Sequence, residues 1–111
     1  MPSERCPIPQ GTLDMLILRI LSVAPGHGYG IAQRLEQVSR GALRVNQGSL
    51  YPALHRLEEK GWLSAEWHAS ETGREAKFYS LTPAGRKQLE VEKESWTRLT
   101  DAVQLIFTEG S

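Results

Sequence analysis

The spacing of the apolar residues changes along the chain, and the order of these changes limits the folds that are open to it. Up to residue 60 the apolar residues recur every three or four positions, which is the spacing of one helical face. Leu63, Ala65 and Trp67 then alternate with polar residues, which predicts a half-buried strand. Beyond residue 82 the helical spacing returns. Helices, a β-hairpin and a last helix therefore follow one another within 111 residues, the length of one domain.

Capping and breaking residues divide the first part of the chain into three helices. We expect the first helix to begin at Thr12, a suitable N-cap, and to end before the Pro-Gly-His-Gly sequence at 25–28. A second helix is expected over about 29–39. A third is expected over about 47–60, with Gly61 as its C-terminal cap.

The hairpin and the last helix complete a winged helix-turn-helix pattern. A second strand is expected over 75–81, and Thr82 and Pro83 are a suitable N-cap and first residue for a helix that runs to about Phe107. The predicted fold is mainly α (α+β). Its three parts are a flexible N-terminal arm, a winged helix-turn-helix DNA-binding domain and a C-terminal dimerisation helix, over residues 1–11, 12–82 and 83–111.

The third helix has an outer face that is suited to reading DNA. Leu50, Leu54 and Leu57 form its buried stripe, so the polar residues between them point outward. Gln and Ser hydrogen-bond to base edges, Arg binds guanine or phosphate, and Tyr donates to phosphate. Taken alone, this face is equally compatible with a solvated surface. The residues expected at the DNA are Gln47, Ser49, Tyr51, His55 and Arg56.

Charge supports DNA binding only locally. The formal net charge is zero, but residues 1–57 carry six Arg against three acidic residues. Arg74 near the hairpin tip and Lys77 on its second strand would place cations beside the DNA backbone. Glu71 and Glu75 flank Arg74, so we expect no deep insertion into the minor groove. The same charges leave an alternative open, a winged-helix module that docks on another protein without DNA specificity.

The last helix carries an apolar heptad pattern. Leu89, Trp96 and Val103 repeat every seven residues, and so do Leu99 and Ile106. A helix of about 25 residues is roughly 37 Å long and would project past a small domain. We therefore expect these five residues to form the seam of a homodimer.

Trp96 has two interpretations. It is either a large interface residue, or one of two symmetry-related rings that line a cavity for a flat aromatic or cationic effector. Met15 lies off the main apolar stripe of the first helix and is the second candidate for contact with an effector.

Other classes of protein are not indicated by the sequence. No apolar run is long enough to span a membrane, and the single cysteine, Cys6, suggests a reducing, cytoplasmic compartment. The His residues and Cys6 have no ligand spacing, so no metal site is expected. No glycine loop, nucleophile elbow or paired carboxylate appears. We therefore expect no enzyme activity, no catalytic residues and no cofactor.

Several motifs together resemble the PadR family of transcriptional regulators. They are residues 28–31 (GYGI), 48–58 (GSLYPALHRLE), 61–63 (GWL) with Trp67, and 78–82 (FYSLT) with Gly85. The resemblance covers about residues 11–107. It implies a homodimer that binds palindromic double-stranded promoter DNA, usually as a repressor, and has no catalytic activity.

By position, the same resemblance adds one residue of the second helix to those at the DNA and supports the assignment of the wing. Tyr29 matches the family's DNA-facing helical residues, and Arg74 and Lys77 match its basic wing. Because only one helix follows the hairpin, the chain is similar to the short subfamily.

Overall fold

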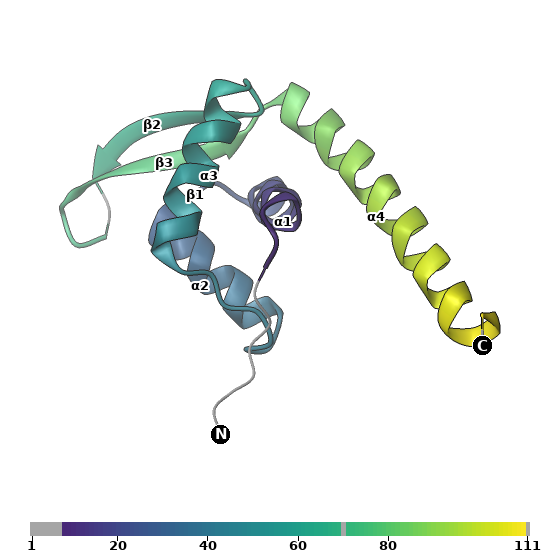
Figure 1. Ribbon diagram of the computed structural model, residues 1–111. Helices are drawn as coiled ribbons and strands as arrows, with labels where there is room; N and C mark the ends of the chain where they lie inside the picture. The colour runs from purple at the N-terminus through teal and green to yellow at the C-terminus, as the bar shows by residue number, and fades with distance from the viewer. Residues whose placement is uncertain (1–7, 70, 111) are drawn as a thin grey trace.

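The computed structural model describes residues 8–69 and 71–110, and its elements follow the predicted order with one short strand added (Figure 1). The mainly helical winged helix-turn-helix prediction is confirmed. The elements are α1 (Gln10–Val23), β1 (Gly26–His27), α2 (Gly28–Val38), α3 (Gln47–Glu59), β2 (Leu63–Ala69), β3 (Glu75–Leu81) and α4 (Pro83–Glu109).

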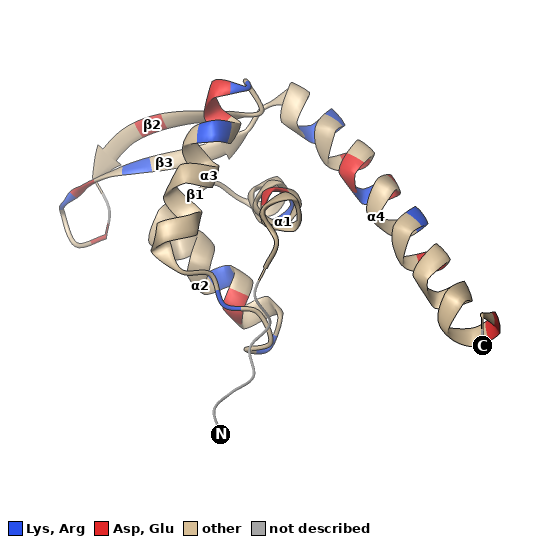
Figure 2. Ribbon diagram, viewed as in Figure 1, with Lys and Arg blue, Asp and Glu red and all other residues tan. Residues whose placement is uncertain are grey.

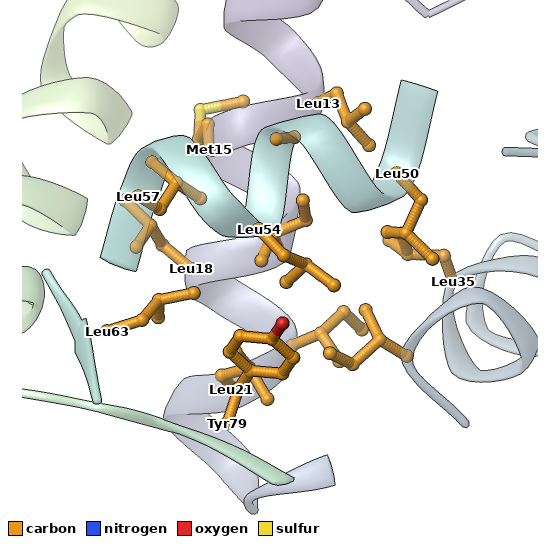
Figure 3. Packing of buried hydrophobic residues seen from close by; sticks show 14 of the residues in the cluster. Leu13, Met15, Leu18, Leu21, Leu35, Leu50, Leu54, Leu57, Leu63 and Tyr79 are labelled. Atoms are coloured by element: carbon orange, nitrogen blue, oxygen red, sulfur yellow. The ribbon is translucent and has the colours of Figure 1, made fainter. Parts of the chain in front are cut away.

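Helix α1 lies at the centre of the domain. It packs against α2, α3, α4 and β3, and most of its apolar residues are buried. Figure 3 shows Leu18 and Leu21 of α1 grouped with Leu54 and Leu57 of α3 and with Tyr79 of β3. Burying one such leucine contributes about 2 kcal/mol relative to leaving it exposed. The shared core therefore holds α3 and the sheet in place against α1.

The N-cap of helix α1 lies three residues earlier than the sequence predicted. It is Pro9, and Thr12 lies inside the helix. A proline at this position loses no hydrogen bond, because the first amides of a helix have no partner within it. Ile8 is partly buried against the core, so the chain is anchored before the helix starts. The last two residues of the predicted arm are therefore helical, while residues 1–7 lie outside the described residues.

The bounds of α2 and α3 agree with the prediction to within one residue. Gly61 has φ +79°, and its amide donates to the carbonyl of Glu58 at 3.0 Å. The amide of Trp62 donates to the carbonyl of Leu57 at 3.1 Å. This left-handed geometry after α3 favours glycine, which confirms the predicted C-terminal cap.

The three strands form an antiparallel sheet in the order β1-β3-β2. Strands β2 and β3 pair along their whole length as the predicted hairpin, or wing. Strand β1 was not predicted, because residues 25–28 were interpreted only as a helix stop. It pairs Gly26 with Tyr79 and His27 with Phe78. This short pairing attaches the start of α2 to the wing.

The outer half of β2 is exposed, although the alternation of residues predicted that one face would be buried. Leu63 is buried and Ala65 is half-buried, but Trp67 is 65% exposed. The core beneath the sheet comes from the helices and ends near Tyr79. The hairpin extends past this core (Figure 1), and Trp67 is not among the residues of the core cluster.

Helix α4 is attached to the domain only at its start. The hydroxyl of Thr82 accepts the amide of Gly85 at 2.9 Å, which confirms Thr82 as the N-cap. A Cβ on Gly85 would overlap the carbonyl oxygen of Trp62, so glycine permits a close approach here. Leu89 is buried in the core, and beyond it the helix extends away from the domain (Figure 1). None of the helices within the described residues is long and apolar enough to cross a membrane.

Candidate nucleic-acid interface

The outer face of α3 carries four of the five predicted DNA-facing residues of this helix. Asn46 caps the helix, and its side-chain oxygen accepts the amide of Ser49 at 2.9 Å. Gln47, Ser49, Tyr51 and His55 are all exposed. They lie opposite the leucines that pack on α1. The packing of these leucines holds α3 in place while the four residues face solvent.

Helices α2 and α3 meet where Tyr51 covers Gly28. A Cβ on Gly28 would lie 2.6 Å from the Tyr51 ring and 2.7 Å from its hydroxyl oxygen. The ring therefore occupies space that only glycine leaves open. Tyr29 follows on the exposed side, and its hydroxyl accepts a 3.4 Å hydrogen bond from Gln33 Nε2. Because that hydroxyl is the acceptor, its own proton can be donated to another group.

The start of α2 is held by His27. Its Nδ1 accepts the amide of Gly30 at 3.1 Å, and its ring meets Phe78 edge-on with the centroids 5.2 Å apart. His68 of β2 stacks on the same phenyl ring at 4.0 Å. These contacts, together with β1, fix Tyr29 relative to the wing. This role of His27 was not predicted from the sequence, because histidine is not among the preferred capping residues.

A hollow of about 950 Å³ lies between the wing and the pair of helices α2 and α3. Four of the eight predicted DNA-facing residues line it, namely Tyr29, Tyr51, Arg74 and Lys77. Trp67 also lines the hollow and was not predicted to do so. The structure therefore brings together residues that are up to 48 positions apart. The sequence signal that could have identified Trp67 is its place on the wing beyond the last core residue of β2.

Arg56 does not lie on the outer face of α3, contrary to the prediction. Its Nη2 is 2.6 Å from Oδ1 of Asp14 in α1, and the two side chains are 30% and 18% exposed. On a helix, Arg56 lies one turn after the buried Ala53 and thus at the edge of the buried stripe. The acid that binds it is 42 residues away in the sequence. Arg56 therefore joins α3 to α1.

Lys77 was predicted to place a cation beside the DNA backbone, but its amine is bound within the protomer. Its Nζ is 3.0 Å from Oε1 of Glu58 on α3 and 5.4 Å from the centre of the Tyr79 ring. The hydrogen bond with Glu58 raises the pKa of the Lys77 amine, and burial raises the pKa of the Tyr79 phenol. Both shifts favour the states that the two groups already have at neutral pH, a cation and a neutral phenol, and Lys77 braces the wing against α3.

Arg74 is the wing cation that stays exposed. It lies near the hairpin turn with Glu71 and Glu75 close to it in the sequence, and Figure 2 shows acidic and basic residues together at the wing tip. Neighbouring carboxylates lower the positive potential that attracts phosphate. Another exposed residue of the interface, His55, has its Nε2 3.3 Å from Oε2 of Glu59.

The predicted dimer residues fall into two groups. Leu89 is 5% exposed and belongs to the domain core, so its prediction as a seam residue is wrong. It is buried because the first turns of α4 pack on α1, a contact that heptad spacing cannot distinguish from a dimer seam. Trp96, Leu99, Val103 and Ile106 are exposed on the part of α4 that leaves the domain.

The two effector candidates lie in different environments. Met15 is buried in the domain core, where Figure 3 shows it among the core side chains, whereas Trp96 is exposed. The interpretation of Met15 as a residue open to a ligand is therefore corrected, since its side chain completes the packing of α1. Across residues 8–69 and 71–110, no group of His, Cys, Asp or Glu could hold a metal ion.

Comparison with known proteins identifies the group to which this domain belongs. The sequence model of the transcriptional regulator PadR-like family matches residues 17–91. The matched region runs from α1 into α4 and includes every element around the hollow. The chain belongs to the PadR-like family. The resemblance noted in the sequence is thereby confirmed.

Individual relatives of this PadR-like chain agree with that membership. A transcriptional regulator of Mycobacterium tuberculosis is 40% identical over 77 residues, which are 69% of this chain and 68% of that protein. A PadR-like transcription factor from Bacteroides fragilis is 35% identical, with a TM-score of 0.72 over 87% of this chain and 91% of the other. A PadR family regulator from Eggerthella lenta is 30% identical, with a TM-score of 0.79 over 90% and 85% of the two chains.

Family membership assigns the general activity. The PadR-like chain is a DNA-binding transcriptional regulator and not an enzyme. In its winged helix domain, α3 and the wing project from one core.

Proposed function

We propose that the chain forms a homodimer that binds specific promoter DNA and represses transcription. The observation that carries this proposal is the uncovered apolar stripe of α4. Trp96, Leu99, Val103 and Ile106 are 43%, 57%, 40% and 68% exposed in a single protomer. Contiguous apolar surface of this kind marks an interaction site in a soluble protein. Heptad spacing fits a second copy of the same helix.

The length of α4 supports the same proposal. The helix has 27 residues and is therefore about 40 Å long. Its buried residues, Gly85 and Leu89, both lie in the first two turns. Most of a helix's stability in a protein comes from packing of its apolar face, so the remaining turns require a partner. Leu105 and Phe107 are exposed as well and widen the apolar surface near its end.

In a dimer, two copies of α3 would meet two half-sites on the duplex. A two-fold symmetric protein reads a palindromic site, because each copy contacts the same bases on opposite strands. Amide, hydroxyl and imidazole groups on the outer face of α3 would contact base edges, while phenol and guanidinium groups would contact phosphates. We assign Gln47, Ser49 and His55 to the bases and Tyr29, Tyr51 and Arg74 to the phosphates.

The exposed indole of Trp96 supports an effector response as a part of this function. Two symmetry-related rings at the α4 seam would stack on a flat aromatic or cationic molecule. A ligand that separates or tilts the two copies would change the spacing of the two α3 helices. DNA would then be released, because the half-site spacing is set by the dimer.

The test is binding of the full chain to the promoter upstream of its own gene at about 100 mM salt, with a random duplex of equal length as the control. We expect a preference for the promoter on the order of a thousandfold. A planar aromatic cation should release the promoter and quench the emission of Trp96. Loss of the gene should raise expression from that promoter.

Two results would contradict the proposal. Equal affinity for the promoter and the random duplex would favour the alternative, a winged-helix module that docks on another protein. Lower expression after loss of the gene would indicate an activator in place of a repressor.

A further inference from the structure

Trp67 is a residue of the wing that takes no part in packing the domain core. It is 65% exposed and is absent from the buried cluster. Its side chain lines the hollow, whose other wall contains Tyr51 and the start of α2. An indole ring is a large apolar group, and folding gains little from one that stays in water. Its position therefore suggests that it contacts something that enters the hollow.

The groups around Trp67 suit a phosphodiester strand. Tyr29 and Tyr51 place two phenol groups at the start of α2, and phenols donate hydrogen bonds to phosphate. His27 caps the amide of Gly30, while the other first-turn amides of α2 have no partner within the helix. A helix N-terminus favours an anion. Several donors to phosphate therefore gather at one wall of the hollow.

The wing itself offers little free positive charge. Lys77 is bound by Glu58, and Arg74 lies near two acidic residues. Contact between the wing and a nucleic-acid backbone therefore depends on apolar surface more than on charge. The indole of Trp67 supplies this surface, and the sugar between two phosphates is the apolar part of the backbone.

We propose that Trp67 is a DNA-contact residue that packs against a deoxyribose of the strand held in the hollow. Tyr29, Tyr51 and Arg74 contact the neighbouring phosphates of that strand. This inference rests on the proposed function. A second copy of the chain is a weaker candidate for the hollow, because α4 extends from the opposite end of the hairpin to its tip (Figure 1).

The first test measures promoter affinity at several salt concentrations for Trp67→Ala and Trp67→Phe in the full chain. We expect Trp67→Ala to weaken binding about tenfold, as for loss of an aromatic contact with a nucleotide, and Trp67→Phe to restore most of it. The salt dependence should not change, because indole carries no charge. Arg74→Ala should instead lower the salt slope by about one. Ser64→Ala, exposed on the opposite face of β2, is the matched control and should bind normally.

Fluorescence gives a second readout. The chain has three tryptophans, so Trp62→Phe with Trp96→Phe leaves Trp67 as the only one. Its emission should change when the promoter duplex is added. Unchanged affinity of Trp67→Ala with unchanged emission would overturn this inference and leave the proposed function intact. A reduced salt slope or a large fall in melting temperature of Trp67→Ala would also overturn it. Failure of the wild type to prefer the promoter would overturn the proposed function itself.

Discussion

Arg56 and Lys77 each form an ion pair that joins two elements of the domain. Arg56 links α3 to α1 through Asp14, and Lys77 links the wing to α3 through Glu58. A fully exposed ion pair contributes up to about 1 kcal/mol. Removing one partner of a more buried pair costs more, because the other charge stays in place unpaired. These two cations therefore position α3 and the wing within the protomer.

Replacing Arg56 with Ala should lower the free energy of unfolding by about 1–2 kcal/mol. The reason is that the carboxylate of Asp14, 18% exposed, loses a partner at 2.6 Å. Asp14→Asn should lower stability similarly, and the double variant should lose less than the sum of the two. Denaturant unfolding measures all three. Normal stability of Arg56→Ala with a smaller salt slope of promoter binding would show instead that Arg56 contacts DNA.

At the scale of the elements, α2 and α3 meet at one close contact. Tyr51 of α3 lies over Gly28, while β1 and the cap by His27 attach the same helix start to the wing. The wall of the hollow is thus assembled from three elements. A change in the contact between α2 and α3 should affect DNA binding before it affects folding, because Tyr51 is exposed and its ring is the flexible end of a side chain.

Gly28→Ala should weaken promoter binding about fivefold to tenfold, comparable to loss of one phosphate or base contact. The new Cβ would meet the Tyr51 ring at 2.6 Å and displace it from the start of α2. Thermal stability should change little, because the ring can swing outward. Gly11→Ala is the matched control, since a Cβ there meets nothing within 4 Å. Normal promoter binding by Gly28→Ala would show that the position of Tyr51 does not matter for DNA.

The whole molecule is elongated, with principal extents of 57 × 39 × 21 Å, because α4 extends beyond the domain. Acidic and basic residues are interspersed along this helix as far as Asp101, and residues 102–108 carry no charge (Figure 2). Its apolar stripe therefore stands out as the surface that a second copy would cover. If folding is linked to assembly, then the apparent stability depends on protein concentration.

The variant Leu99→Asp with Val103→Asp should be monomeric at concentrations at which the wild type is dimeric. Two carboxylates in an apolar seam would be desolvated without a partner, which costs several kcal/mol. Sedimentation measures the assembly state, and the melting temperature should rise with concentration for the wild type only. Thr97→Asp, on the polar side of α4 near Lys93 and Arg98, is the control and should remain dimeric. A wild type that is monomeric throughout would contradict the homodimer.

Much of the fold could be predicted from the sequence because its signals are local. Periodic leucines, the cap at Thr82 and the glycine at 61 depend on neighbours within a few residues, and their predictions agree with the structure. The N-cap of α1 was predicted three residues late, and β1 was missed. The first depends on Ile8 reaching the core, and the second on strand β3, which is about 50 residues further along the chain.

By itself the sequence determined the order of the elements apart from β1, and most of the outer face of α3 and of the exposed stripe of α4. Only the tertiary structure decided which of the predicted residues are free to act. Within the protomer, ion pairs hold Arg56 and Lys77, and the core contains Leu89 and Met15. Trp67 is exposed, although the alternation of residues in its strand predicted that it would be buried. The physical reason is that a residue's position in the chain fixes the helix or strand face on which it lies, but not what packs against that face. Long side chains bind the nearest opposite charge in space, which here comes from a distant part of the sequence.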